Sequence, residues 1–217
     1  VYRNTEHGIA FEEQAPLGGH DPYSASKAAS EMVVESYAKS FLAEHGVALA
    51  SARAGNAIGG GDWSQERLIP DAIRAWSKGS CLDVRRPNAV RPWQHVLEPL
   101  FGYIKLAEVI WDNPNLAQPF NFGPNADDVF TVRNVVEQAS TAFGKGDAEF
   151  APFETGPHEA HLLSLDNTKA KKKLGVGPKW RTDEAISVTM NWYRRHFNGA
   201  DARDLCMGDI AAYEAAA

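Results

Sequence analysis

A tyrosine and a lysine four positions apart, Tyr23 and Lys27, have the types and spacing of a catalytic base and its helper. Positions i and i+4 share one face of a helix, so a phenol and an ammonium can meet over one substrate. A free phenol of this kind loses its proton only near about pH 10, so its use as a base at pH 7 needs roughly 4 kcal/mol of stabilisation of the phenolate. A cation about 4 Å away supplies that much at an effective dielectric of roughly 20.

The spacing alone is weak evidence, because six tyrosines and ten lysines in 217 residues give about 0.3 such pairs by chance. On spacing alone, a surface coincidence is favoured by about two to one. The context reverses these odds. Residues 17–27 read Leu-Gly-Gly-His-Asp-Pro-Tyr-Ser-Ala-Ser-Lys, which resembles the active-site segment of extended short-chain dehydrogenase/reductases, where Pro-Tyr-x-x-Ser-Lys opens a helix.

Later blocks narrow the resemblance to the CDP-glucose 4,6-dehydratase family. They include Arg-Ala-Gly-Asn-Ala-Ile-Gly-Gly-Gly-Asp-Trp at 53–63 and Arg-Pro-Trp-Gln-His-Val-Leu-Glu-Pro at 91–99, with shorter blocks at 67–71, 120–124, 158–160 and 173–175. The resemblance implies NAD as cofactor and CDP-glucose as substrate, with oxidation at C4, loss of water across C5 and C6, and hydride return to C6. It implies that Tyr23 takes the proton of the 4-hydroxyl and that Lys27 assists it while holding the nicotinamide ribose.

The resemblance also implies a set of substrate-binding residues, each of which has a simpler alternative. Asn56 would contact the diphosphate, although a turn-forming asparagine beside a glycine is equally expected. Arg91 would grip the diphosphate in a fork, although a lone arginine is more often a surface residue by about three to one. The remaining expected contacts are Arg67, Leu68 and Ile69 over the base and ribose, Asn121, and His158 and Glu159, which alone read as an exposed loop.

Two parts of the family pattern are missing from these 217 residues. One is the glycine-rich strand–loop–helix that cradles a dinucleotide pyrophosphate. The other is the Ser/Thr, Asp and Lys that the family carries before the segment matching Val1. We therefore expect the chain to be the downstream part of an enzyme and expect it, taken alone, neither to bind NAD nor to dehydrate a sugar nucleotide. The sequence upstream of Val1 is the most informative observation still to be made.

Cap and periodicity signals supply the elements that must position these residues. They predict helices over 23–44, 69–78, 96–111, 131–143, 167–174 and 182–197 and strands over 47–53, 81–84, 120–122 and 149–153, with a glycine-rich loop at 57–62. The fold class is therefore α/β, and the resemblance implies a partial Rossmann fold plus a smaller α/β substrate-binding domain. The expected division is 1–56 and 93–112 for the NAD-binding domain, and 57–92 and 113–217 for the sugar-nucleotide domain.

Composition and charge exclude several other function classes. The formal net charge of −6 argues against sequence-independent nucleic-acid binding, which needs a basic face. The uncharged stretches are too short to span a membrane. The two cysteines indicate a reducing compartment and no disulfide framework, so we expect a cytoplasmic protein. The histidines and cysteines lack zinc-like spacing, so no metal site is predicted.

The helices over 23–44 and 96–111 resemble the pair that forms a four-helix bundle between two copies in this family, which implies a homodimer. Apolar residues on these helices fit either that interface or an intramolecular core: Val33, Tyr37, Phe41, Leu100, Ile104 and Leu106. A core position is also expected for four tryptophans: Trp93, Trp111, Trp180 and Trp192. A short helix is all that the tail at 209–217 predicts.

Two alternatives to the dehydratase remain open at this point. One is another nucleotide-sugar dehydratase or epimerase of the same superfamily, because no single residue fixes the base. The other is a nucleotide-sugar-binding or assembly module without catalysis. A glycine-rich unit and a Ser/Thr-Asp-Lys triplet encoded upstream of Val1 favour an enzyme, whereas translation that starts near Val1 favours the binding module.

Overall fold

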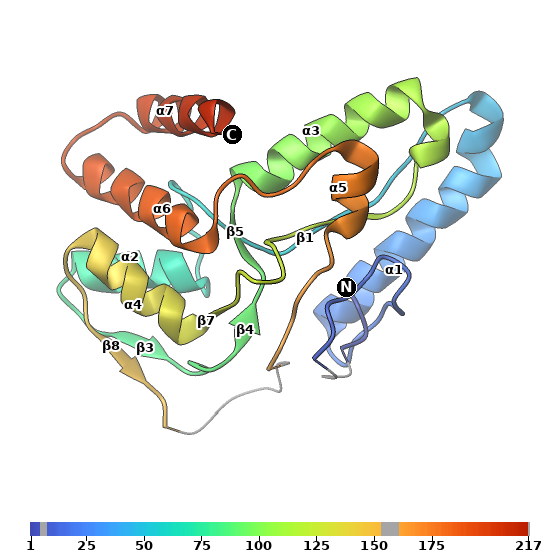
Figure 1. The fold of residues 1–217 in the computed structure, drawn as a ribbon. Coiled ribbons are helices and arrows are strands. Elements are labelled where there is room, and N and C mark those ends of the chain that lie inside the picture. The colour runs from blue at the N-terminus through green and yellow to red at the C-terminus, as the bar shows by residue number, and fades with distance from the viewer. Residues whose placement is uncertain (5–7, 153–160, 217) are drawn as a thin grey trace.

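The computed structural model describes residues 1–4, 8–152 and 161–216, in which helices and short strands alternate (Figure 1). The helices are α1 (Pro22–Tyr37), α2 (Leu68–Ser77), α3 (Leu97–Asp112), α4 (Val132–Phe143), α5 (Thr168–Leu174), α6 (Thr182–Phe197) and α7 (Ala202–Ala215). A short π-helix, η1 (Ala38–Leu42), and a 3-10 helix, η2 (Ala43–His45), extend α1, and a second 3-10 helix, η3 (Pro114–Leu116), follows α3. The strands are β1 (Ala52–Ala54), β2 (Asn56–Ile58), β3 (Leu82–Val84), β4 (Val90–Arg91), β5 (Trp93–His95), β6 (Phe120–Phe122), β7 (Phe130–Thr131) and β8 (Ala148–Phe150).

The strands of the described residues pair in twos. β1 pairs with β6, β2 with β5 and β3 with β8, all in parallel, whereas β4 and β7 are antiparallel. β1 and β2 belong to one stretch, 52–58, which changes partner at Gly55. A Cβ atom at Gly55 would lie 2.3 Å from the carbonyl oxygen of Pro92, so only a glycine permits this approach. Parallel strands connected through helices confirm the predicted α/β class.

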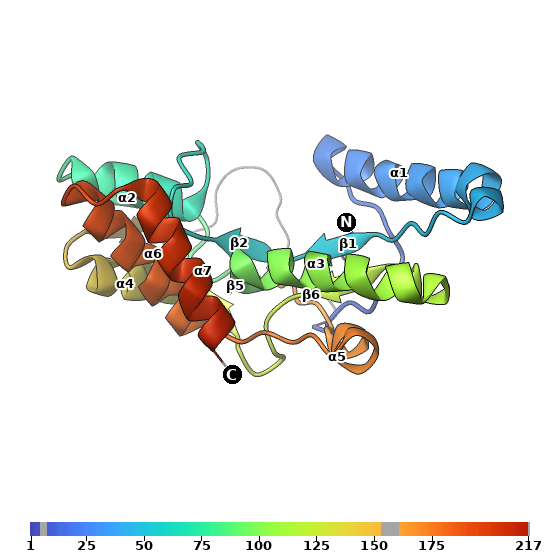
Figure 2. The same cartoon turned by 90° about the horizontal axis from the view of Figure 1, so that it is seen from above.

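The main hydrophobic core lies between α2, α4 and α6 and the strands β2, β3 and β5. Its largest fully buried side chains are Trp76, Tyr193, Ile73, Ile186, Met190, Val135 and Val136. Figures 1 and 2 both show α2, α4 and α6 gathered at one end of the molecule and α1 at the opposite end. The segment of candidate nucleotide contacts at the start of α2 is therefore built on this core.

Two smaller clusters stabilise the remaining elements. One joins α3, β6 and α5 through Leu106, Phe120 and Phe122, and the other joins α7 to the start of α3. In the second, buried Glu98 accepts hydrogen bonds from the backbone N–H of Trp180 and from the hydroxyl of Tyr213, each at 2.7 Å. Burial raises the pKa of Glu98 despite these donors.

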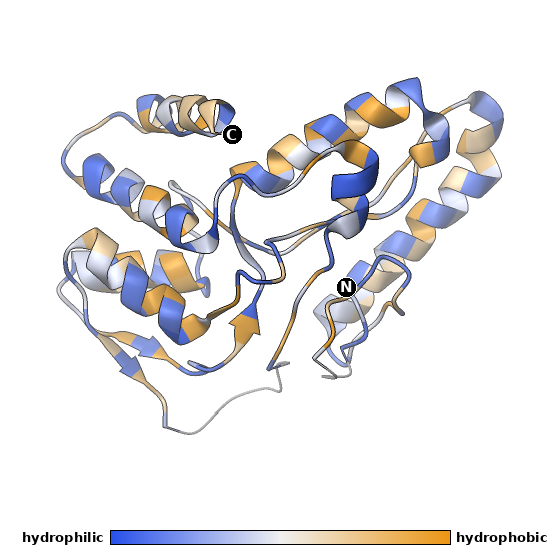
Figure 3. Ribbon diagram, in the orientation of Figure 1, coloured by the Kyte–Doolittle hydropathy of each residue, from blue (hydrophilic) through white to orange (hydrophobic). Residues whose placement is uncertain are grey.

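Helix α1 has well-formed ends but little cover. Asp21 caps it by accepting a hydrogen bond from the backbone N–H of Ser24 at 2.9 Å, and Pro22 occupies the first turn. Among its residues only Ala28 is buried. Figure 3 shows hydrophobic positions interspersed with hydrophilic ones along α1 and α3. Apolar side chains exposed on these two helices and on η1 are Met32, Val33, Tyr37, Phe41, Leu100, Ile104 and Trp111.

Several predictions on secondary structure and burial need correction. The strand predicted over 47–53 covers only Ala52–Ala54, and the loop predicted at 57–62 begins later, because Asn56–Ile58 forms β2. The tail forms the fourteen-residue helix α7 rather than a short one. Trp111 is 86% exposed rather than in the core, because it lies on the last turn of α3, away from β6 and α5. Trp93, Trp180 and Trp192 are buried as predicted.

Candidate active site

The predicted catalytic pair lies at the beginning of α1. The Tyr23 side chain is 64% exposed, and the Lys27 ammonium nitrogen lies 5.8 Å from the centre of its ring. The Asp21 cap sets where the helix begins, and the i and i+4 positions then place both groups on one face. Within the described part of the chain, neither the phenol nor the ammonium has a hydrogen-bond partner, so both are available to a ligand.

One turn further along the same face of α1, an ion pair attaches the helix to β1. Glu31 follows Lys27 by four positions and forms a two-pronged ion pair with Arg53 of β1, with N–O distances of 2.6 and 2.9 Å. The side chains of Arg53 and Glu31 are only 11% and 16% exposed. Burial alone would raise the pKa of Glu31, but the hydrogen bonds and charge of Arg53 outweigh it and lower that pKa. Sequence reasoning missed this pair, because no local pattern links two residues twenty-two positions apart.

Arg53 also joins a buried network that includes the predicted substrate residue Asn121. Its guanidinium donates to the Tyr2 hydroxyl at 2.7 Å, and that hydroxyl donates to Asn121 Oδ1 at 2.6 Å. The Asn121 side-chain amide nitrogen donates to the carbonyls of Phe11 and Asp166. Asn121 is 0% exposed, and its polar side-chain atoms are engaged by the protein itself. We therefore leave Asn121 out of the proposed ligand contacts, because the structure uses it to join β6 to the N-terminal segment.

Asn56 and Arg91 lie close to one another at the start of the β2–β5 pair. Asn56 begins β2 and is paired in register with Trp93, two residues after Arg91. Both Asn56 and Arg91 are half-buried. The Arg91 guanidinium donates to the carbonyl of Val90 at 2.9 Å, and it reaches the carbonyl of His161 at 3.5 Å. The two residues predicted to contact a diphosphate thus lie on neighbouring strand segments, Asn56 on β2 and Arg91 on β4 just before β5.

The third predicted contact segment opens α2. Arg67 is exposed and extended at the N-cap position, Leu68 is half-buried, and Ile69 is 2% exposed within the main core. The Ile69 side chain therefore anchors the segment, and contacts with a ligand would come from Arg67 and Leu68. His158 and Glu159, predicted to close the pocket, lie outside the described residues.

Comparison with known proteins gives this geometry its context. The GDP-mannose 4,6 dehydratase family model matches residues 1–189. The chain belongs to this family. The chain is 39% identical over 221 residues to a CDP-glucose 4,6-dehydratase of Salmonella typhimurium, which covers 99% of this chain and 62% of that protein. It is 28% identical to a dTDP-glucose 4,6-dehydratase of Streptomyces antibioticus, covering 89% of this chain and 55% of that one. The chain thus spans less than two thirds of the length of these relatives.

Solved structures show the same fold as this member of the GDP-mannose 4,6 dehydratase family. A dTDP-glucose 4,6-dehydratase of Bacillus anthracis in complex with NAD superposes with a TM-score of 0.71 at 24% identity, over 92% of this chain and 60% of that one. A UDP-glucose 4-epimerase of Thermus thermophilus in complex with NAD gives 0.72 at 25% identity, over 93% and 61%. The fold is therefore that of extended short-chain dehydrogenase/reductases.

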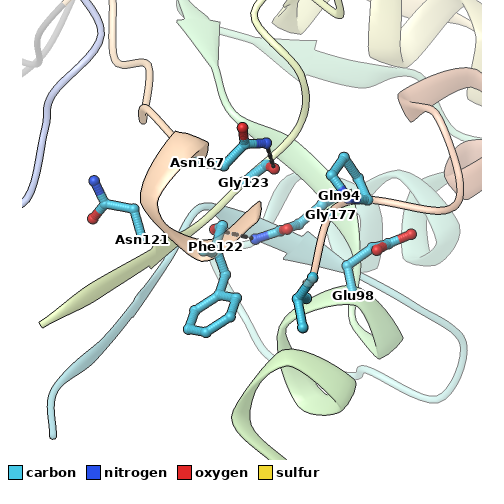
Figure 4. Close-up of a pocket in the computed structure, with 10 residues that line it drawn as sticks. Gln94, Glu98, Asn121, Phe122, Gly123, Asn167 and Gly177 are labelled. Carbon is cyan, nitrogen blue, oxygen red and sulfur yellow. Dashed lines mark hydrogen bonds between the residues drawn. The ribbon is translucent and has the colours of Figure 1, made fainter. Parts of the chain in front are cut away.

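A small cavity behind the strands is not a substrate site of this family member. It measures about 10 Å³ and is lined by Gln94, Glu98, Asn121 and Asn167 among others (Figure 4). Gln94 Nε2 donates to the carbonyl of Phe122 at 3.0 Å, and Asn167 Nδ2 donates to that of Gly123 at 2.9 Å. Since a single water needs about 10–15 Å³, the cavity has room for one water at most. Its amides serve to hold β5, β6 and α5 together.

The described residues contain neither a metal-ligand cluster nor a membrane span. No group of three or more histidine, cysteine, aspartate or glutamate side chains there is arranged to hold a metal ion. No helix within these ranges has the length and apolar character needed to cross a bilayer. Cys81 and Cys206 are both free and exposed.

Proposed function

We propose that this chain provides the catalytic base and the nucleotide-sugar site of an NAD-dependent CDP-glucose 4,6-dehydratase. The observation that carries the proposal is the Tyr23–Lys27 pair, exposed on one face of α1 and anchored one turn later by Glu31 and Arg53. The 39% identity to a CDP-glucose 4,6-dehydratase supports the choice of cytidine as the base. Two dTDP-glucose 4,6-dehydratases of Streptomyces are less similar to this chain, at 28% and 27% identity.

In this proposal Tyr23 takes the proton of the sugar 4-hydroxyl, and Lys27 stabilises the resulting phenolate by its positive charge. NAD, when bound, supplies the acceptor and later the donor of hydride. The free phenol and ammonium of the pair fit the nicotinamide ribose, where Lys27 would hold the ribose hydroxyls. The ion pair of Glu31 with Arg53 would keep α1 in one orientation during the reaction, so that Tyr23 and Lys27 stay directed at the substrate.

The nucleotide end of the substrate would lie on a different set of residues. Asn56 and Arg91 would hold the diphosphate, since a guanidinium can donate two parallel hydrogen bonds to phosphate oxygens. Arg67 and Leu68 would pass over the base and ribose. We keep His158 and Glu159 as predicted residues of the pocket. The division into 1–56 with 93–112 and 57–92 with 113–217 would then place the catalytic pair in the first part and the nucleotide contacts in the second, except for Asn56 at the boundary.

We further infer a homodimer and a cytoplasmic location. The exposed apolar residues of α1 and α3, among them Tyr37 and Ile104, would pack against the same helices of a second copy. Leu106 is not part of this surface, because it is 4% exposed in the cluster with β6. Free exposed cysteines fit a reducing compartment. Sedimentation equilibrium of Tyr37→Asp should show monomers where the unaltered protein shows dimers, and a dimeric variant would refute this interface.

Two variants test the catalytic and binding parts of the proposal separately. In the full gene product, Tyr23→Phe should reduce turnover of CDP-glucose by 10²–10⁴-fold, the usual worth of general base catalysis, while binding stays within a few-fold. Arg91→Ala should weaken binding by roughly 1.5–3 kcal/mol, and Arg91→Lys should not restore it, because an ammonium cannot donate in a fork. Binding is measured by calorimetry and the 4-keto product by its absorbance in alkali.

The outcomes also distinguish the competing functions. A Tyr23→Phe variant that keeps more than about a tenth of the turnover would remove Tyr23 as the base. A 4-epimer in place of a 4-keto-6-deoxy product would indicate an epimerase, and preference for dTDP-glucose would change the base. Binding of CDP-glucose without any turnover in the full gene product would indicate a binding module.

A further inference from the structure

The segment from Gly59 to Arg67 lies between the proposed diphosphate contact Asn56 and helix α2, and it ends at the proposed base contact Arg67. Side chains from helices α2 and α6 hold its backbone. The hydroxyl of Tyr193, on α6, donates to the carbonyl of Asp62 at 2.6 Å. The guanidinium of Arg74, on α2, donates to the carbonyls of Trp63 and Ser64, each at 2.9 Å. Three consecutive carbonyls are therefore bonded to side chains rather than left to water.

The beginning of the segment lies against a second residue of α6. A Cβ atom at Gly60 would come within 2.0 Å of Trp192 Cγ, so the backbone rests directly on the indole. Only glycine allows this contact without displacing the ring. Gly61 follows with a φ of 83°, a left-handed conformation that glycine adopts without strain. The run of glycines thus serves close packing on α6.

Trp63 adds a side-chain contact at the middle of the segment. Its ring meets that of Tyr193 edge to face, with 5.3 Å between ring centroids, and also lies 6.2 Å from that of Phe197. Trp63 is 46% exposed, and the other residues of 61–67 are exposed as well. An exposed stretch of this length would sample many conformations without such attachments.

The end of the segment stores strain where it meets Arg67. Glu66 has a φ of 60°, and within the described residues it is the one non-glycine with a positive φ. Such a conformation persists only where the surroundings hold it, and it is found disproportionately at ligand sites. Because Glu66 directly precedes Arg67, its backbone conformation sets the direction in which Arg67 leaves the segment.

We propose that Tyr193 and Arg74 are positioning residues that fix the segment 59–67 so that Arg67 and Leu68 meet a nucleotide in a preformed geometry. This inference rests on the proposed function, which supplies the ligand, and deepens it by naming what holds the site. Neither residue touches the ligand. Their effect is to remove the cost of ordering the segment when a cytidine nucleotide binds. Burial raises the pKa of Tyr193, so its hydroxyl remains a donor over the working range of pH.

Tyr193→Phe and Tyr213→Phe form a matched pair for the test. Both tyrosines are buried, at 0% and 3% exposure, and each donates one short hydrogen bond. Tyr193 donates to the carbonyl of Asp62 and Tyr213 to the carboxylate of Glu98. Each change keeps the ring and removes one donor. Tyr213→Phe should lower the melting temperature at least as much as Tyr193→Phe, because its acceptor is a buried carboxylate, but only Tyr193→Phe frees the segment 59–67.

The measurements are CDP affinity by calorimetry and hydrogen–deuterium exchange of residues 59–67, both on the full chain. We expect Tyr193→Phe to weaken CDP binding about fivefold, the worth of one typical hydrogen bond, and to speed exchange in this segment. Tyr213→Phe should change neither. In the full gene product, Tyr193→Phe should raise KM for the nucleotide sugar and leave kcat within about twofold, a split that general destabilisation does not produce.

Three outcomes would overturn the inference. Unchanged exchange in Tyr193→Phe would show that the hydroxyl does not hold the segment, and the proposed function would stand. Equal loss of affinity in both variants would reduce Tyr193 to a contributor to overall stability. An unaltered full gene product that binds no CDP would overturn the proposed function itself, and with it the ligand assigned to this segment, whatever the exchange pattern shows.

Discussion

Helices α1 and α6 are each sixteen residues long, but they are held in place in opposite ways. Seven residues of α6 are buried, and they pack between α4, β2 and β5. One residue of α1, Ala28, is buried, and the ion pair of Glu31 with Arg53 ties the helix to β1. Burial of apolar area stabilises α6, whereas a specific polar contact orients α1.

The difference separates two requirements of the proposed function. The proposed nucleotide segment rests on a continuous core, so its geometry follows from packing that any small change of volume disturbs. The proposed catalytic pair lies on a helix whose exposed apolar face leaves room for a partner. A polar contact adds less net free energy than a core but defines direction, because its hydrogen bonds have fixed geometry. Four sets of matched changes test this contrast.

The largest difference is expected between two methionines. Met190 on α6 is 0% exposed and Met32 on α1 is 63% exposed. Met190→Ala should lower the free energy of unfolding by about 4 kcal/mol, because it removes buried methylenes and leaves a cavity. Met32→Ala should change it by less than about 0.5 kcal/mol. Urea denaturation of both variants measures this, and similar losses would show that α1 is also packed.

Two histidines, one buried and one exposed, extend the comparison to the pH dependence of stability. Burial lowers the pKa of His95 to about 4, below the value of about 6.5 for an exposed histidine. The unfolded chain therefore binds more protons between these values, so stability is complete above about pH 6.5 and falls by up to about 3 kcal/mol as the pH drops towards 4. His95→Gln should flatten this dependence. His45→Gln, at the exposed end of η2, should leave it unchanged, and an equal effect of the two would contradict the assignment.

The anchor of α1 comes next in size. Glu31→Gln leaves the mostly buried guanidinium of Arg53 without its carboxylate and should cost about 2 kcal/mol of unfolding free energy. In a double-mutant cycle with Arg53→Met, the two losses should be strongly non-additive, since the second change removes the stranded charge. Additive losses would mean that the pair does not orient α1.

The smallest difference in the free energy of unfolding is expected between two lysine variants. The Lys179 ammonium donates to the carbonyls of Tyr213, Glu214 and Ala216 at the end of α7. Lys179→Met should lower the free energy of unfolding by about 1 kcal/mol, because those carbonyls lose a charged donor. Lys39→Met, which breaks the exposed pair with Glu35 next to α1, should stay within about 0.5 kcal/mol of the unaltered protein. Thermal unfolding at moderate salt compares them, and a larger loss for Lys39→Met would contradict the expectation that the end of α7 is held more firmly than the end of α1.

Local signals in the sequence predicted the helices well. The predicted bounds 131–143 nearly coincide with α4, which Thr131 and Asn134 cap reciprocally and Gly144 ends in the left-handed region. The helix over 182–197 matches α6 in both ends. Caps act through neighbouring backbone groups, so the information lies within a few residues of each end.

Long-range contacts were predicted less well. A helical pattern of apolar residues shows which face is apolar but not what covers it, and so Trp111 was expected in the core and Leu106 was left open between core and interface. The same limit hid the contact of Arg53 with Glu31, twenty-two positions apart, and the contact of Tyr193 with Asp62. Side-chain pairs of this kind depend on the tertiary path of the chain, which no local pattern encodes. The Tyr23–Lys27 pair was found because both partners lie on one helix.

Because the strand partner changes at Gly55, the stretch 52–58 holds Arg53 and Asn56 at a fixed distance from one another. Arg53, which orients the helix of the proposed base, and Asn56, which faces the proposed diphosphate, are three extended residues apart, or roughly 10 Å along the chain. Pairing with β6 before the glycine fixes the position of Arg53, and pairing with β5 after it fixes that of Asn56. Inserting one residue between Arg53 and Asn56 would increase their separation and turn Asn56 to the opposite face of the strand. In the proposed function, this interval would help set the distance between the base on α1 and the diphosphate of a bound sugar nucleotide.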